Sequence, residues 1–219
     1  MAYRRLTIPM TSTSATAPLR PVPPPPRVPI DTDNFNRANT AEGTLGETAG
    51  GRPWKTGRYR ILNNRAVIED GAPSQIYRAV VDLDPMIDVE IHATVYPPSG
   101  GPGAGLAVRG GNLPAAPFYW LWGSGHQGTQ NWTIRRRDGG TNVDVLDTGI
   151  PVEEGPYEMA LIVNGSTVTA VIDGQSFSTT DTNVAGGTHV GFYAIPTNNA
   201  GTTTATSAFD NVAIYEPTS

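Results

Sequence analysis

The sequence has no cysteine, three histidines and a single lysine, Lys55, among its 219 residues. Without cysteine the chain can form no disulfide bond and no thiolate zinc site, and it has no cysteine nucleophile. Long apolar runs are also missing. None approaches the ~20 residues that cross a bilayer, and residues 1–9 lack the apolar core of a secretory signal. We therefore expect no membrane insertion and, if the protein reaches the outside of the cell, a route other than secretion.

Positive charge is scarce outside the N-terminal region. The net charge is −5, and residues 1–32 carry four arginines against Asp31, which makes them +3 and leaves −8 for the rest. A surface that binds phosphate backbones needs a basic field, and the one dense cluster is Arg135-Arg136-Arg137. We expect no nucleic-acid partner.

Turn formers and two-residue periodicity dominate what is present. The chain has 25 glycines and 20 prolines. Residues 86–96 and 157–163 alternate apolar and polar side chains, which predicts strands buried on one side. The pair Asn164-Gly165 predicts a type I′ hairpin turn. Further strands are expected at 58–62, 65–69, 105–109, 118–122, 132–137, 143–146, 167–172, 175–179 and 189–195.

The last strand, within residues 205–216, closes the expected fold. Phe209, Val212 and Ile214 are spaced to be buried, while Asp210 and Asn211 stay polar at a bend. Such a strand suits pairing beside the first one. The sequence thus predicts an all-β fold, a two-sheet antiparallel jelly-roll sandwich over residues 33–219.

Residues 1–32 differ in composition from the sandwich and are expected to form an extended Pro-rich arm. Prolines between Pro18 and Pro29 favour polyproline II and exclude a central strand. We interpret the arm as an anchoring peptide followed by a stiff spacer, with an incidental tail as the alternative. The side chains expected to dock on a partner are Arg4, Arg5, Leu6, Ile8 and Arg20.

A set of short motifs along the chain resembles a known family. They are Asp33-x-Phe35-Asn36-Arg37-Ala38, Gly43-Thr44-Leu45-Gly46, Trp54, Ile61-x-Asn63-x-x-Ala66, Gly105-Leu106-Ala107-Val108-Arg109, Ile134-x-Arg136, Val190-Gly191-Phe192 and Phe209-Asp210-Asn211-Val212. Their order resembles the concanavalin A-like (laminin G-like) jelly-roll domain, in the version found in minor tail and other accessory virion proteins of phages that infect actinobacteria. A single lysine also fits a GC-rich genome.

The resemblance implies a structural virion protein of a bacteriophage, a minor tail protein. It would be assembled in the host cytoplasm and exposed on the particle in multiple copies. Its arm would dock on other virion proteins, and its sandwich would touch host cell-envelope polysaccharide. The alternatives are a free carbohydrate-binding module, a phage head decoration protein and a glycoside hydrolase.

The sequence offers no recognisable catalytic apparatus. Related sandwiches that cleave β-glucans carry a Glu-x-Asp-x-Glu strand, which holds two carboxylates about 5.5 Å apart for retaining hydrolysis. Here Asp88-Val-Glu90 and Glu153-Glu154 have the wrong spacing or lie in a loop. Glu90 and His92 share a strand face, which we interpret as a hydrogen-bonded surface pair. We therefore expect a protein that is not an enzyme.

The aromatic segment Phe118-Tyr-Trp-Leu-Trp122 is the candidate glycan platform. If Leu121 points into the core, Trp120 and Trp122 lie on the open face, and alternation adds Arg109, Arg135 and Arg137 to them. Indole faces stack on sugar rings, so this would make an aromatic and cationic groove for acidic or neutral polysaccharide. The alternative is that both tryptophans fill the core or a subunit contact.

A structural calcium ion is the remaining cofactor to consider. Sandwiches of this kind often join their terminal strands through a hard cation, and Asp33 and Asp210 are the candidate ligands. The alternative is that both acids cap turns. Apart from this ion we expect no cofactor.

Overall fold

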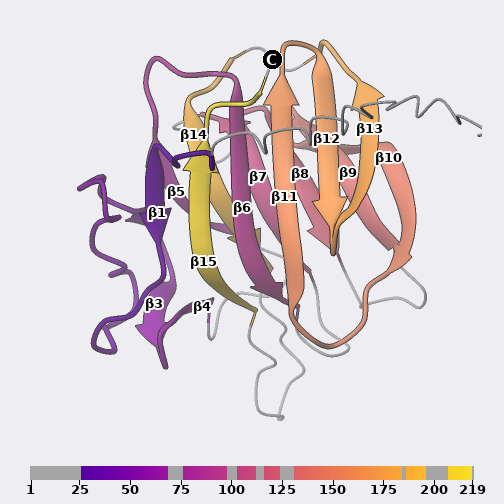
Figure 1. Ribbon diagram of the computed structural model, residues 1–219. Helices are drawn as coiled ribbons and strands as arrows, with labels where there is room; N and C mark the ends of the chain where they lie inside the picture. The colour runs from indigo at the N-terminus through magenta and orange to yellow at the C-terminus, as the bar shows by residue number, and fades with distance from the viewer. Residues whose placement is uncertain are drawn as a thin grey trace, which may run out of the picture.

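The computed structural model describes residues 26–68, 76–97, 103–111, 116–123, 131–183, 186–195 and 207–218. This part contains 15 β-strands and no helix. The strands form two antiparallel sheets that pack face to face, one in front of the other (Figure 1). The expected all-β sandwich is confirmed. Within the described residues, no helix is long and apolar enough to cross a membrane.

The first sheet has eight strands in the order β13-β12-β11-β6-β15-β4-β3, with β1 also paired to β15. Its strands are β1 (Asp31–Asp33), β3 (Tyr59–Leu62), β4 (Arg65–Ile68), β6 (Val89–Tyr96), β11 (Tyr157–Asn164), β12 (Thr167–Ile172), β13 (Gln175–Thr180) and β15 (Ala208–Tyr215).

The second sheet has seven strands in the order β10-β9-β8-β7-β14-β5-β2. Its strands are β2 (Lys55–Thr56), β5 (Tyr77–Asp82), β7 (Ala104–Gly110), β8 (Phe118–Gly123), β9 (Asn131–Asp138), β10 (Thr141–Pro151) and β14 (His189–Ala194).

The first and last strands lie side by side, as expected from the sequence. Asp31 of β1 pairs with Ile214 of β15 (Figure 1). Along β15 the register against β6 shifts between Asp210 and Ala213, and Asn211 has φ +51°. This bulge is the bend predicted between the buried residues of β15.

The domain boundary expected between residues 32 and 33 is wrong, because it falls inside β1. The Ile30 amide also donates to the Ile214 carbonyl at 2.8 Å. The sandwich therefore begins several residues earlier than expected. The side chains of the predicted docking arm, Arg4, Arg5, Leu6, Ile8 and Arg20, lie outside the described residues.

The core lies between the sheets and is built from the inward-facing side chains of both. Its centre is aromatic: the Phe192 ring of β14 stacks on the Phe209 ring of β15 with centroids 4.3 Å apart. Phe35, Trp54 and Tyr59 also contact Phe192. Alternation along the strands supplies the rest of this core, since every second residue faces the opposite sheet.

Two tight turns join β11, β12 and β13 into the predicted meander. Asp173 and Gly174 both have positive φ, +46° and +81°, as a type I′ turn requires. The other turn differs from prediction by one residue. Asn164 pairs with Thr167, so Gly165 and Ser166 are the central residues, and of these Gly165 has φ +57°.

Candidate functional site

The outward face of the second sheet is where the sequence placed the glycan platform. Leu121 faces the core, and Trp120 and Trp122 face outward with Phe118, so the predicted alternation of β8 is confirmed. Trp120 lies opposite Arg135 of β9, and Phe118 lies opposite Arg137. The aromatic and basic side chains do share one face.

The tryptophans are nevertheless not open to solvent. The expectation that they stack on sugar rings is therefore wrong. Trp120 is 1% exposed and Trp122 is 4% exposed. Their rings pack on each other with centroids 4.4 Å apart, and Phe118 stacks on Tyr193 of β14 at 4.5 Å. The rings form a second apolar cluster outside the main core. Protein contacts cover their faces, so no sugar ring can stack on them.

Small residues on β7 accommodate this cluster. Its outward positions between β8 and β14 are Gly105 and Ala107. A Cβ on Gly103, just before β7, would lie 2.4 Å from the Trp122 ring. The large rings of the flanking strands therefore cover the narrow middle of the sheet.

Arg109 does not lie on this face. The expectation that it lines the groove is therefore wrong. It has φ +54° at the point where the register between β7 and β14 shifts. Its side chain is 7% exposed and forms an ion pair with Asp88 at 2.5 Å. It also donates to the carbonyl oxygens of Ile87 and Gly165. Arg109 thus joins the two sheets at one end of the sandwich.

The other two predicted arginines stay on the outward face but have different partners. Arg135 forms an ion pair with Asp144 of β10 through its Nε at 2.5 Å. Arg137 donates to the neutral side-chain oxygen of Asn142 at 3.1 Å. Only Arg137 lines a pocket among those described below.

A pocket of about 380 Å³ opens at the β2 side of this face. Its basic lining residues are Lys55, Arg78 and Arg137, and its apolar and aromatic ones include Ile76, Phe118 and Tyr193. Sequence reasoning missed most of this set. Residues 77–82 were not recognised as a strand, because the run Ala79-Val80-Val81 hides the alternation that places Arg78 and Asp82 outward. No sequence motif near Lys55 predicts a binding site.

Asp82 and His189 hold Lys55 at the pocket rim. Its Nζ donates to Asp82 at 3.1 Å and to Nε2 of His189 at 3.0 Å. Burial lowers the pKa of His189, and the charges of Lys55 and Arg78 lower it further, against the attraction of Asp82. The neutral imidazole can therefore accept from the ammonium group. The hydrogen bond from Thr188, supported by that from Lys55, lowers the pKa of Asp82 to about 2 against the opposing effect of burial.

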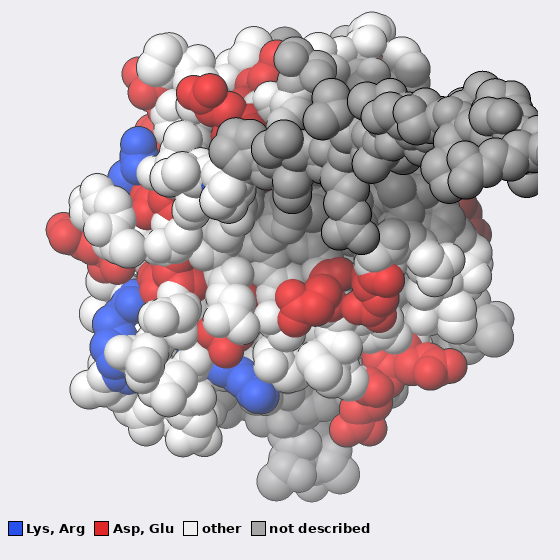
Figure 2. All heavy atoms as spheres, in the orientation of Figure 1, with Lys and Arg blue, Asp and Glu red and all other residues white. Residues whose placement is uncertain are grey.

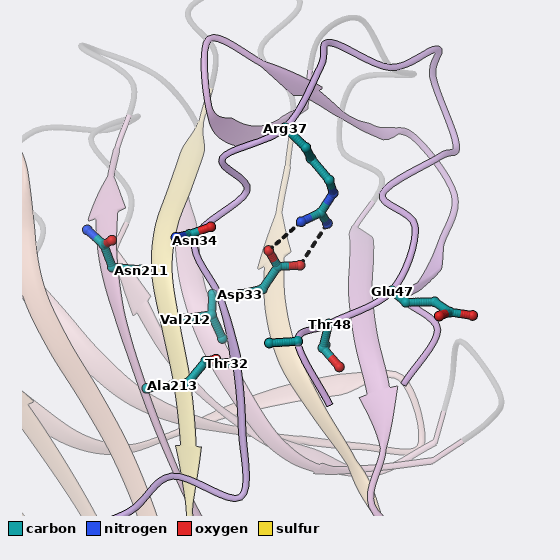
Figure 3. A pocket seen from close by; sticks show the side chains of 10 residues that line it. Thr32, Asp33, Asn34, Arg37, Glu47, Thr48, Asn211, Val212 and Ala213 are labelled. Carbon is teal, nitrogen blue, oxygen red and sulfur yellow. Dashed lines mark hydrogen bonds and ion pairs between the residues drawn. The ribbon is translucent and has the colours of Figure 1, made fainter. Parts of the chain in front are cut away.

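A second pocket, of about 510 Å³, lies beside β1 and β15 (Figure 3). It contains one of the two predicted calcium ligands, Asp33. The Asp33 carboxylate accepts two bonds from Arg37, at 2.7 and 2.8 Å, and one each from the Phe35 amide and Trp54 Nε1, both at 2.8 Å. The guanidinium group occupies the position of a cation, so the expected metal role of Asp33 is not supported by this geometry.

The other predicted calcium ligand, Asp210, lies on the outer face of the first sheet. Burial raises its pKa, and the nearby carboxylates of Asp33 and Glu158 act in the same direction against Arg65 and the Asn211 amide. In the described ranges there is no group of three or more His, Asp or Glu side chains placed to hold a metal ion. The Asp210 carboxylate accepts from the Asn211 amide at 2.8 Å, so it caps the bulge of β15.

The outer face of the first sheet carries acidic side chains that the middle of the second sheet lacks at its described positions. Acidic side chains gather on the face of the first sheet (Figure 2), where Glu158 and Asp210 lie. Glu90 on the same face is 4% exposed and is hydrogen-bonded to His92, which confirms the predicted pair. On the second sheet, the described outward positions of β7, β8 and β9 hold no carboxylate.

No known protein family matches the sequence, and no curated protein matches it. Solved structures do share the fold. They include the carbohydrate-binding module CBM66 from Bacillus subtilis, with TM-score 0.51 and 13% identity over 87% of this chain and 99% of that one. The Bacillus licheniformis β-glucanase has TM-score 0.56 and 12% identity over 85% and 97%.

A β-1,3-1,4-glucanase from a mouse hindgut metagenome has TM-score 0.55 and 15% identity over 85% of this chain and 98% of that one. At these identities the likeness concerns the fold. The chain has the fold of a two-sheet jelly-roll sandwich, an architecture that it shares with a carbohydrate-binding module and two glucanases.

Proposed function

We propose that the chain is a structural protein of a bacteriophage particle, a minor tail protein, whose sandwich binds glycan on the host surface. The binding site is the pocket on the second sheet. The observation that carries the proposal is the grouping of Lys55, Arg78 and Arg137 with the partly exposed Ile76 and Tyr77 in one pocket on a sheet face. Pockets with an apolar wall and a few convergent polar groups are typical of small-ligand sites.

Binding without turnover fits the same face. Retaining glycosidases need two carboxyl groups about 5–5.5 Å apart across the scissile bond. The central strands of this face, β7 to β9, present aromatic, small and basic residues at their described outward positions. Among the similar folds are a module named for carbohydrate binding and two glucanases, which supports a glycan as the ligand class.

The experiment pairs a glycan array with an assay of released reducing sugar on the purified full chain. The proposal expects retention on one or more glycans and no sugar release. Release of sugar would make the chain a hydrolase, and the absence of any glycan bound would remove the pocket as a glycan site.

The virion role rests on the motif order and on the N-terminal arm. Arg27, between Pro26 and Pro29, is tied to the sandwich through Glu90. Residues before it would dock on neighbouring virion proteins. Several copies on one particle would bind glycan together, so that weak single contacts give a high overall avidity.

Deleting residues 1–25 tests the docking role while leaving Arg27 and β1 in place. We expect the truncated chain to fold, to bind the same glycans and to be missing from purified particles. Normal incorporation would contradict docking by the arm. A full-length chain that never enters particles would instead favour a free carbohydrate-binding module.

A further inference from the structure

We infer that the pocket on the second sheet selects an anionic sugar residue, whose acid group is received by Arg137, Arg78 and Lys55. The inference rests on the proposed glycan-binding function and deepens it by naming the ligand chemistry. The shared chemistry is a saccharide that carries a carboxylate or a phosphate group.

The charge of the pocket is the first argument. The chain as a whole has a net charge of −5. The pocket lining contains three basic side chains and no acidic one. A basic hollow on an acidic protein directs an anion to one place on the surface, because like charges elsewhere repel it.

Arg137 supplies the strongest single feature. The side-chain bond that it makes goes to a neutral partner, Asn142, so this contact leaves the guanidinium charge uncompensated. Its Nε is buried and has no hydrogen-bond partner within the described structure. A guanidinium group presents its donors in a planar fork that matches a carboxylate or a phosphate. The terminal nitrogens of the guanidinium group, rather than the covered Nε, would therefore receive an incoming acid group.

Arg78 and Tyr193 are arranged around the same position. Arg78 is oriented by donation to the Gly111 carbonyl at 2.9 Å. The Tyr193 phenol has its pKa raised by burial, while bonding to Arg78 and the charges of Arg78 and Arg137 oppose this effect. Both guanidinium groups thus act on one phenol, and the phenol stays protonated as a further donor.

Lys55 adds a third positive charge at the rim. Asp82 and His189 fix the ammonium group in position. Beside these polar groups, Ile76 and Tyr77, both partly exposed, provide an apolar wall. A sugar ring with an acid substituent has both the apolar C–H face and the negative charge that this lining complements.

The test is calorimetric titration of the full chain with three probes at low salt. They are oligogalacturonate, the same oligomer with its acid groups methyl-esterified, and a phosphorylated mannan oligosaccharide. We expect one of the acidic probes to bind about tenfold or more tightly than the neutral ester, since charge-assisted bonds are lost with the acid group. Which acidic probe binds tells carboxylate from phosphate.

Matched variants assign the effect to the pocket. Arg137→Gln should weaken binding of the acidic probe about tenfold, and Lys55→Gln should weaken it less, because Lys55 is paired with Asp82. The control is Arg65→Gln on β4 of the other sheet, where the guanidinium stacks over the Tyr96 ring at 3.8 Å. This control carries the same charge change and should keep full affinity.

The outcomes separate this inference from the proposed function. Equal binding of the ester and the acids, unchanged by Arg137→Gln, would overturn the selection of anions and leave glycan binding in place. Equal weakening by Arg65→Gln would also overturn it, because the effect would then come from net charge alone. No binding of any glycan would remove both proposals. If Arg137→Gln does not fold, Lys55→Gln at an exposed position still decides the result.

Discussion

Arg27 and Glu90 form an ion pair across 2.8 Å, although they lie 63 residues apart in the chain. The Glu90 carboxylate is 5% exposed and also bonds to His92. The Arg27 guanidinium lies over the Tyr215 ring at 4.8 Å and donates to the Glu216 carbonyl. These contacts hold the short segment that precedes β1 against the outer face of the first sheet.

Loss of the Arg27 contact should loosen this segment. Arg27→Ala leaves a buried carboxylate with one partner fewer, and we expect a loss of roughly 1–2 kcal/mol in the free energy of unfolding. Hydrogen exchange at Ile30 should also become faster. Arg58→Ala is the control, because its pair with Glu42 is longer, at 3.4 Å, and both side chains are more exposed. Equal losses in the two variants would contradict a special role for Arg27.

Phe192 should be among the most costly core residues to truncate. It is fully buried and stacks on Phe209 between the sheets. Phe192→Ala should lower the free energy of unfolding by about 3–5 kcal/mol, from lost burial and the cavity left behind. The same substitution at the partly exposed Phe177 of the edge strand β13 should cost far less. Urea denaturation measures both, and similar costs would contradict the assigned core.

Chelation should not change the melting temperature of the protein. Asp33 already accepts four hydrogen bonds, so EDTA and added calcium should both leave Tm unchanged. Asp33→Asn breaks the buried pair with Arg37 and should cost about 3 kcal/mol. Asp210→Asn should be neutral or slightly stabilising at pH 7, since burial disfavours the charged form of Asp210. A Tm that EDTA lowers and calcium restores, lost in both variants, would establish a calcium site.

Acid stability should depend on Asp82. Its folded pKa of about 2 lies below the ordinary value of about 3.9. The carboxylate therefore contributes stability above about pH 4 and loses it as the pH falls towards 2. Asp82→Asn should cost about 1 kcal/mol at pH 7, since the side chain is one-third exposed.

Urea midpoints between pH 7 and pH 2 measure this difference between the parent and Asp82→Asn. The difference should shrink on acidification. Asp138→Asn, at an exposed position at the end of β9, is the matched control and should follow the parent at every pH. A gap that widens below pH 4 would contradict the assigned sign.

Much of the fold was predictable because strand alternation is a local property. The pairing of β1 with β15 and the meander β11 to β13 follow from residue spacing and turn formers. The strand β5 was missed, since its central residues Ala79, Val80 and Val81 are all buried. Val80 packs in the outer aromatic cluster while its neighbours pack in the main core. Burial on both faces erases the two-residue pattern.

The candidate site was predictable only in part. Alternation correctly assigned Trp120, Trp122, Arg135 and Arg137 to one face of the second sheet. It could not reveal that the indole rings are covered, because coverage depends on Tyr193 and Val80 from strands distant in sequence. Nor could it reveal that a bulge with positive φ turns Arg109 to the end of the sandwich.

Residue spacing alone determined that this chain is a two-sheet sandwich with an aromatic and basic face. The reason is that the alternation of apolar and polar residues within each strand shows which side chains point inward. Only the tertiary structure decided which part of that face forms a pocket. Lys55, Arg78 and Arg137 come from strands far apart in the chain. Their convergence depends on strand order and on long-range packing, which no local pattern encodes.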